Sequence, residues 1–362
     1  MNHTHFKRIN EKSWLNMSDE KLDTKETLAQ RKRYYWIDHA RGFIMILLVI
    51  TEFLPTIFRE GSEMARFFLA HPPNQTIVEY MNFYDIGAPA FIFIMGLLMP
   101  LSFSHRKERD GVTQTVRHMV IRYGIIFLLG FLVIFIDHGE IITMVGGVFV
   151  IIWDVLPTLG LVGLIAIPFL LLKPKPRAIV ATAMLIFYQF MLLFGGWREY
   201  AIISIHGGIF GTIFSFSVIM IYATCLGEVM LLNKDYPDKK KYQIYAIVGA
   251  IALFGGLLLW LVPGWYPNKR QVTLTYILIC LGASILLSFI FIGIDKKVQK
   301  PIFILDSYGK SPFIIYVIAI VLEFLLSDII SLDMNLLIFI IMVIIMSTIA
   351  ILLDKWGKVI KL

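Results

Sequence analysis

The sequence predicts an all-α, polytopic integral membrane protein, and its composition and the spacing of its apolar runs are the observations that predict it. Of the 362 residues, 58% are hydrophobic and only 16% are charged, and the mean hydropathy is +0.76. A soluble domain of this length cannot bury so much apolar surface, so lipid is the expected solvent. Helix is the expected conformation of each span, because an open strand would leave backbone groups unpaired in lipid.

About ten apolar runs have, or nearly have, the roughly 17–25 residues that a membrane-spanning helix needs. The expected spans are 42–58, 86–103, 119–136, 155–172, 178–194, 212–232, 244–262, 274–294, 308–326 and 335–353. Residues 140–172 form an apolar stretch that is too long for one span and too short for two, and Asp154 and Pro157 interrupt it. We therefore predict a re-entrant or interfacial segment at 141–153, on the outer side of the membrane.

The distribution of positive charge predicts the orientation of the chain. With the N-terminus inside, the inner connections and the C-terminal end hold 17 Lys and Arg residues, and the outer connections hold 5. The positive-inside rule then places both termini in the cytoplasm, and the plasma membrane is the expected location. Residues 1–35 are polar throughout and lack the apolar core of a secretory signal. We expect a disordered cytoplasmic tail at 1–35 and one transmembrane domain at 36–362.

Several function classes find no support in the sequence. The net charge of +7 comes from basic residues in short loops between apolar runs, which indicates membrane topology and not a nucleic-acid partner. Cys225 and Cys280 both lie inside apolar runs, where we expect small core residues and neither a disulfide nor a metal site. The chain has no zinc-type spacing, phosphate-binding loop, dinucleotide glycine motif or nucleophile elbow, so no metal is expected.

Ionisable residues at membrane depth predict a polar path inside the protein. Glu52 lies ten residues after Gly42, which is about 15 Å along a helix. A charge at this depth is costly, so its side chain must face a partner or water. Glu52 and Glu323 would also suit a proton-coupled transporter or flippase, which is the alternative function. A catalytically silent scaffold is a third interpretation, and the polar path disfavours it.

Most of the other polar residues also have a structural interpretation. Asp85 could stabilise the positive end of the helix dipole at the start of its span. Lys269 could be an interface anchor, and Arg41 and Arg122 could be ordinary cations of the inner face. His71, in the polar loop before Asp85, could be solvated surface. On residue pattern alone these alternatives stay open.

Five segments resemble segments of a known family. They are "YYWIDHARGFIMILLVITEF" with Asp38, Arg41 and Gly42; "FYDIGAPAFIFIMGLLMPLSF" with Asp85, Pro89, Phe91, Phe93, Met95 and Gly96; "VRHMVIRYGIIFLLGFL"; "YPNKRQVTLTY" with Pro267, Asn268, Lys269 and Thr273; and "YGKSPFIIY" with Gly309, Pro312 and Tyr316. Through them the chain resembles the heparan-α-glucosaminide N-acetyltransferase family, within the wider transmembrane acyltransferase group, from about residue 34 to 320. It departs from the family's pattern at Glu52, Val272 and Ser311.

The resemblance implies acyl transfer across the membrane, from cytosolic acetyl-CoA to an amino or hydroxyl group of an extracytoplasmic saccharide. The family places its catalytic histidine in the outer loop before the Asp–Pro–Phe segment, and only His71 occupies such a place here. His71 would act as base or acyl carrier, and Asp85 would orient its imidazole. Asn268 or Lys269 would stabilise the developing oxyanion. The sequence does not decide between direct transfer and an acyl-histidine intermediate.

The donor site is expected near the inner face, because the phosphates of CoA need cationic partners. Arg41, Arg122 and Lys310 lie at inner ends of predicted spans, and Asp38 belongs to the same motif as Arg41. These four residues form the predicted acetyl-CoA site. The lipid bilayer is the other expected partner, and the sequence leaves a homodimer open.

Overall fold

The computed structural model describes residues 34–53, 81–145, 147–204, 206–326, 330 and 336–356. The predicted cytoplasmic tail, 1–35, lies outside the described residues except for its last two positions. His71 also lies outside the described residues. Residues Trp36–Leu362 form one compact unit. All contacts described below lie within that unit.

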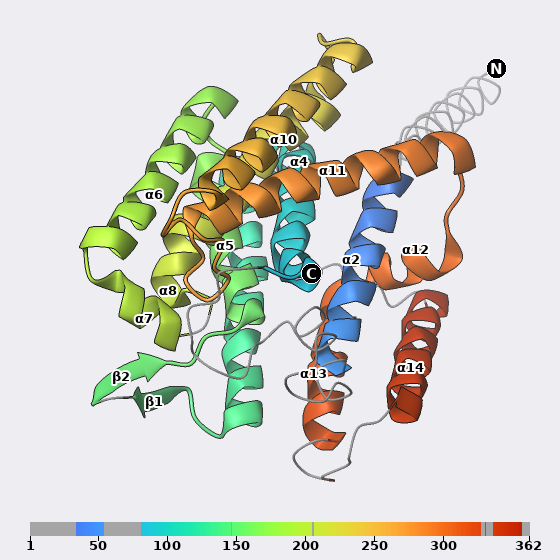
Figure 1. Ribbon diagram of the computed structural model, residues 1–362. Helices are drawn as coiled ribbons and strands as arrows, with labels where there is room; N and C mark the ends of the chain where they lie inside the picture. Colours follow the sequence, from blue (N-terminus) through green and yellow to red (C-terminus); the bar gives the residue numbers. More distant parts are fainter. Residues whose placement is uncertain are drawn as a thin grey trace, which may run out of the picture. The chain divides into compact units, whose positions relative to one another are not determined.

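The unit is built almost entirely from helices (Figure 1). In chain order the helices are α2 (Tyr35–Phe53), η1 (Phe83–Ile86), α4 (Gly87–His138), α5 (Val155–Phe169), α6 (Pro174–Phe194), α7 (Trp197–Ile203), α8 (Gly208–Gly211), η2 (Thr212–Phe216), α9 (Ser217–Gly227), η3 (Glu228–Leu232), α10 (Asp238–Trp260), α11 (Leu274–Val298), α12 (Phe303–Lys310), α13 (Pro312–Phe324) and α14 (Leu336–Lys355). The prediction of a helical, multi-pass membrane protein is therefore confirmed.

The predicted count of ten spans is not confirmed. Within the described ranges, six helices are long and apolar enough to cross a membrane, or seven if the bent pair α12–α13 is one span. The difference comes from three helices. α4 counts once although it carries two predicted spans, one on each side of a break at Gly111. α5 has only 15 residues, and α2 carries three charged residues along its length.

α4 contains two helical arms that meet at Gly111. This residue has φ 79° and ψ 169°, in contrast to the helical residues on either side of it. A positive φ is open to glycine because it has no Cβ. One predicted span lies in each arm, 86–103 before Gly111 and 119–136 after it.

The segment 141–153 contains a β-hairpin, which gives a definite form to the predicted re-entrant or interfacial segment. β1 (Ile142–Val145) pairs antiparallel with β2 (Val148–Ile151), and Val145 is opposite Val148. Only two residues therefore connect the strands, and the second of them, Gly147, has φ 81°. Two glycines between β-branched runs are a known hairpin signal, which the sequence contains as "VGGV".

Two glycines allow α2 and α12 to touch backbone to backbone. A Cβ added at Gly42 would collide with the carbonyl of Leu305, and a Cβ added at Gly309 would collide with the carbonyl of Asp38. Small residues permit this close approach between helices in a membrane. The contact joins the first and the last of the sequence motifs described above.

Replacing Gly42 with alanine is therefore expected to lower the thermal unfolding temperature of the detergent-purified protein. Overpacking of this kind costs about 1–3 kcal/mol. Gly124→Ala is the matched control, because nothing lies within 4 Å of a Cβ at Gly124. Alanine favours a helix over glycine by about 1 kcal/mol, so the control should be at least as stable as wild type. A Gly42→Ala protein with unchanged stability would contradict the close packing of α2 on α12.

A sharp bend separates α12 from α13. The two helices meet at an angle of 84°, at Ser311 and Pro312. Proline has no backbone N–H and fits the first position of a helix, so it can begin α13 but cannot continue α12. The bend leaves Lys310 at the end of α12, while α13 leads away towards Glu323.

Candidate functional site

Two groups of polar side chains lie at the two ends of α2. The Asp306 cluster consists of Asp38, His39, Arg41, Asp306, Lys310 and Asp354, and the Asp154 cluster consists of Glu52, Asp85, Asp154, His206, Lys269 and Tyr316. α2 contributes Arg41 to the first and Glu52 to the second. These residues are eleven positions apart, which corresponds to about 17 Å along a helix.

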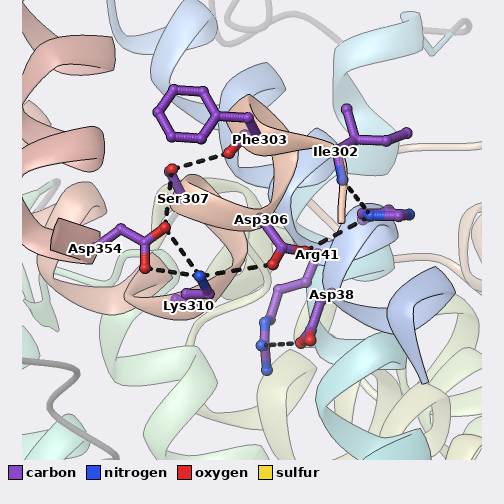
Figure 2. Close-up of polar contacts among 9 residues, drawn as sticks. Asp38, Arg41, Ile302, Phe303, Asp306, Ser307, Lys310 and Asp354 are labelled. Carbon is purple, nitrogen blue, oxygen red and sulfur yellow. Dashed lines mark hydrogen bonds and ion pairs between the residues drawn. The ribbon is translucent and has the colours of Figure 1, made fainter. Parts of the chain in front are cut away.

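Lys310 lies between two carboxylates in the Asp306 cluster (Figure 2). Its Nζ is 2.7 and 2.9 Å from the two carboxylate oxygens of Asp354, on α14. It is also 3.6 Å from Oδ2 of Asp306, one turn earlier on α12. Lys310 thus ties α12 to α14, and its charge is balanced within the cluster.

His39 connects α2 to the start of α12. Its side chain is fully buried, and the backbone N–H of Ile302 donates to its Nε2 over 2.9 Å. Nε2 therefore carries the lone pair in this arrangement. Oδ1 of Asp306 lies 3.6 Å from the same nitrogen. These contacts fix Asp306 next to α2 and make His39 a structural member of the cluster.

Arg41 pairs with Asp38 within α2. Its Nη2 lies 2.6 Å from Oδ1 of Asp38, and the two side chains are 21% and 17% exposed. The structure thus brings together Asp38, Arg41 and Lys310, three of the four predicted donor-site residues. Both cations already have a carboxylate partner, so a phosphate that binds here has to compete with Asp38 or Asp354.

Arg122, the fourth predicted donor-site residue, lies in the second arm of α4. Its guanidinium carbon is 5.4 Å from the centre of the Tyr123 ring. Its Nε is buried and makes no hydrogen bond to any residue that the structure describes. Arg122 is not part of the Asp306 cluster as defined above, and its donor-site role stays a prediction.

Glu52 is surrounded by polar partners in the Asp154 cluster. The Tyr316 hydroxyl, on α13, donates a hydrogen bond to its carboxylate. Glu52 also interacts electrostatically with Asp154, Glu323 and Lys269. The surroundings of Glu52 therefore agree with the expectation that its carboxylate faces polar groups. Tyr316 and Glu323 place α13 beside the end of α2.

Asp85 and Lys269 form a largely buried ion pair. Nζ of Lys269 is 3.2 Å from Oδ1 of Asp85, and the side chains are 17% and 7% exposed. The other oxygen of Asp85 accepts a hydrogen bond from the backbone N–H of Asn82 over 2.7 Å. The Tyr276 hydroxyl donates to the backbone carbonyl of Asp85 over 2.6 Å. Two predicted catalytic residues from distant parts of the chain are thus in direct contact.

The loop that carries Lys269 is held in place through its backbone. Three successive carbonyls accept hydrogen bonds from other elements: Arg270 from the Gly207 N–H at 2.7 Å, Gln271 from the Tyr188 hydroxyl at 2.9 Å, and Val272 from the Ser215 hydroxyl at 2.7 Å. Hydrogen bonds of this number restrict the loop strongly. The position of Lys269 is therefore set by α6, η2 and the residues before α8.

Asn268 shapes the same loop from inside. Its Oδ1 accepts the N–H of Gln271 over 2.8 Å, and its own N–H donates to Thr273 Oγ1 over 3.1 Å. Thr273 in turn caps α11, because its hydroxyl oxygen accepts from Tyr276 N–H. Asn268 thus has a positioning role in the structure. Its predicted role at the oxyanion stays a prediction.

His206 and Asp154 form a pair, and from the sequence His206 is a catalytic candidate only if His71 is not the base. Nε2 of His206 is 4.0 Å from Oδ1 of Asp154, and the histidine side chain is 6% exposed. Asp154 also caps α5 by accepting the Val155 N–H over 2.6 Å. Both residues were visible as polar interruptions of apolar sequence. Nothing in that pattern indicated that they would meet.

Comparison with protein families decides the class of the chain. Residues 34–355 match a family model whose description is acyltransferase domain. The chain belongs to this acyltransferase family. The match supports the predicted transmembrane acyltransferase group and does not confirm the narrower resemblance to heparan-α-glucosaminide N-acetyltransferases. A search of curated proteins found no significant match.

This membrane acyltransferase shows no group of three or more His, Cys, Asp or Glu side chains suited to a metal ion in the ranges that the structure describes. Cys225 and Cys280 are buried free thiols. The two clusters supply carboxylates, two ammonium groups, one guanidinium, two imidazoles and a phenol. Of the predicted catalytic residues, Asp85, Asn268 and Lys269 lie close together, and His71 lies outside the described residues.

Proposed function

We propose that this acyltransferase moves an acetyl group from cytosolic acetyl-CoA to an amino or hydroxyl group of an extracytoplasmic saccharide. The observation that carries the proposal is that one helix, α2, bears a polar cluster at each end. With the predicted orientation, the Asp306 cluster is on the cytoplasmic side and the Asp154 cluster is on the outer side. The long, thin pantetheine arm of CoA would run between helices from the first cluster to the second.

The donor's phosphates would bind at the cytoplasmic end, next to Arg41 and Lys310, with Arg122 as a third cation. A guanidinium group binds phosphate oxygens through two parallel hydrogen bonds, which the ammonium group of a lysine cannot form. Arg41 and Arg122 are therefore better suited than Lys310 to hold a phosphate. Before the donor arrives, Asp38 and Asp354 neutralise the cations. Donor binding therefore includes an exchange of a carboxylate for a phosphate.

The transfer step would take place at the Asp154 cluster. The acceptor's oxygen or nitrogen attacks the thioester carbonyl, a C–O or C–N bond forms, and the C–S bond breaks. The negative charge that develops on the carbonyl oxygen needs a preorganised donor, and the ammonium of Lys269, held by Asp85, has this role. His71 is proposed as base or acyl carrier, as the family resemblance implies. The thiolate leaves as the thiol of CoA after it takes up the proton that the acceptor has lost.

The alternative of a proton-coupled transporter also has support in the structure, since Glu52 interacts with Glu323 and Tyr316. Membership of an acyltransferase family favours the transferase. The deciding measurement is the transfer of labelled acetyl from acetyl-CoA to amino- and hydroxyl-bearing saccharides by the purified protein. Transfer is expected. A protein that binds no acetyl-CoA and transfers no label would overturn the proposal.

Arg41→Ala is expected to weaken acetyl-CoA binding by about 1.5–3 kcal/mol, the range for a hydrogen bond to a charged group. This corresponds to a roughly tenfold to hundredfold higher dissociation constant, measured by titration of the purified protein. Lys239→Ala is the control, because Lys239 is an exposed cation in the first turn of α10, on the same predicted side. Equal affinity in wild type, Arg41→Ala and the control would remove Arg41 from the donor site.

A further inference from the structure

His206 lies in the Asp154 cluster through both its side chain and its backbone. The side chain faces Asp154, with Nε2 4.0 Å from Oδ1, and Asp154 interacts electrostatically with Glu52. The next residue, Gly207, donates its N–H to the carbonyl of Arg270, the neighbour of Lys269. An imidazole, a carboxylate and an ammonium from three separate parts of the chain therefore converge at one end of α2.

The backbone of His206 has a conformation that L-amino acids rarely adopt. Its φ is 50°, and the two glycines that follow have φ 70° and 58°. Glycine would adopt this conformation without strain, whereas a side chain with a Cβ destabilises it. Residues held in such conformations are found preferentially at functional sites, where the surrounding structure maintains them. The side chain of His206 therefore destabilises this backbone conformation relative to a glycine at the same position.

We propose that His206 is the general base that takes the acceptor's proton and that Asp154 is its positioning residue. The proposal rests on the acyl transfer proposed above. The imidazole removes a proton from the acceptor's hydroxyl or neutral amino group as the C–O or C–N bond forms. In a direct transfer it then gives the proton to the CoA thiolate as the C–S bond breaks. If His71 carries the acetyl group, the C–S bond breaks in the earlier step that forms acetyl-His71, and His206 gives the acceptor's proton to the His71 imidazole as its bond to the acetyl group breaks. Neither route needs another reactant. Asp154 holds the imidazole's orientation and stabilises its charged form.

The distance of 4.0 Å between His206 and Asp154 is longer than a hydrogen bond. Catalytic hydrogen bonds are often long in the absence of substrate and shorten in the reactive complex. The proposal also gives a definite role to His71. An imidazole that carries the acetyl group cannot take the acceptor's proton at the same time, so His206 as base leaves His71 as the acyl carrier.

The test uses His206→Gly in the full-length, detergent-purified protein. Glycine removes the imidazole and relieves the positive φ, so this variant should unfold at the same temperature as wild type or higher. Acetyl-CoA affinity should be unchanged, while kcat for transfer to the saccharide should fall a hundredfold or more. Added imidazole should restore part of the rate, because a small base can enter the space that the side chain has left.

Two further variants complete the experiment. Asp154→Asn keeps a side chain that caps α5 well but removes the carboxylate charge, so kcat should fall with little change in stability. His138→Asn is the control, since His138 is an exposed histidine at the end of α4, and transfer should be retained.

The outcomes separate this inference from the proposed function. If wild type transfers acetyl and stable His206→Gly transfers it within a few fold of wild type, His206 is not the base and the proposed function stands. If His206→Gly loses activity but imidazole restores none, and Asp154→Asn is fully active, the role is structural and the inference is wrong. If wild type itself transfers no acetyl, the proposed function fails and the inference fails with it.

Discussion

Replacing His71 with alanine is expected to lower acetyl transfer by a hundredfold or more, the usual scale for a lost general base or nucleophile. Acetyl-CoA binding should not change, because the proposed nucleotide site is at the far side of a hydrocarbon core about 30 Å thick. The measurement is transfer of labelled acetyl to a saccharide, with donor binding determined on the same preparations.

Asn74→Ala is the control for His71→Ala, because it alters the same predicted loop without removing a titratable group. The control should retain transfer. If His71→Ala retains full activity while His206→Gly loses it, the acyl group passes directly from CoA to the acceptor and His71 has no chemical role. If both histidine variants remain active, neither imidazole takes part in the reaction.

Breaking the ion pair between Asp85 and Lys269 is expected to affect both stability and rate. Removing one partner leaves the other charge buried, which costs about 3–5 kcal/mol. Asp85→Asn and Lys269→Met should therefore each lower the unfolding temperature. The neutral double variant should recover most of the stability, because neither charge is then left without its partner.

The double variant separates the structural role of the pair from its chemical role. Loss of one oxyanion donor lowers kcat about a hundredfold to a thousandfold. If Lys269 stabilises the oxyanion, the stable double variant should remain inactive by this factor, with unchanged acetyl-CoA affinity. Recovery of transfer together with stability would show that Lys269 serves only to hold the loop at η1.

The fold was predictable from the sequence wherever the length of an apolar run determines the local structure. Every predicted span overlaps a helix in the described ranges, because a long apolar run in lipid has no alternative to helix. The number of spans was less predictable, because both arms of α4 extend as helix into the expected polar connection between residues 103 and 119 and only Gly111 separates them. The two glycines of "VGGV" are a hairpin signal, but the apolar length of 140–172 is equally typical of a re-entrant or interfacial segment, so length alone does not predict the hairpin.

The candidate site was predictable in part, because the predicted orientation of the chain assigns each polar residue to one side of the membrane. This placed Arg41 with Lys310, and Asp85 with Lys269, and each pair belongs to one cluster in the structure. Asp306 and Asp354 were missed. Neither residue belongs to one of the five segments described above, and their role depends on how α12 packs on α14. Contacts between distant helices leave no local pattern in the sequence.

The backbone contact between α2 and α12 has a mechanical consequence. Gly42 and Gly309 leave no side-chain layer that could deform between the two helices, so one cannot slide along the other without separating from it. A helix is also stiff over the 17 Å or so between Arg41 and Glu52. We therefore expect a displacement of α12 at Lys310 to move α2 as a rigid body, including Glu52 in the opposite cluster.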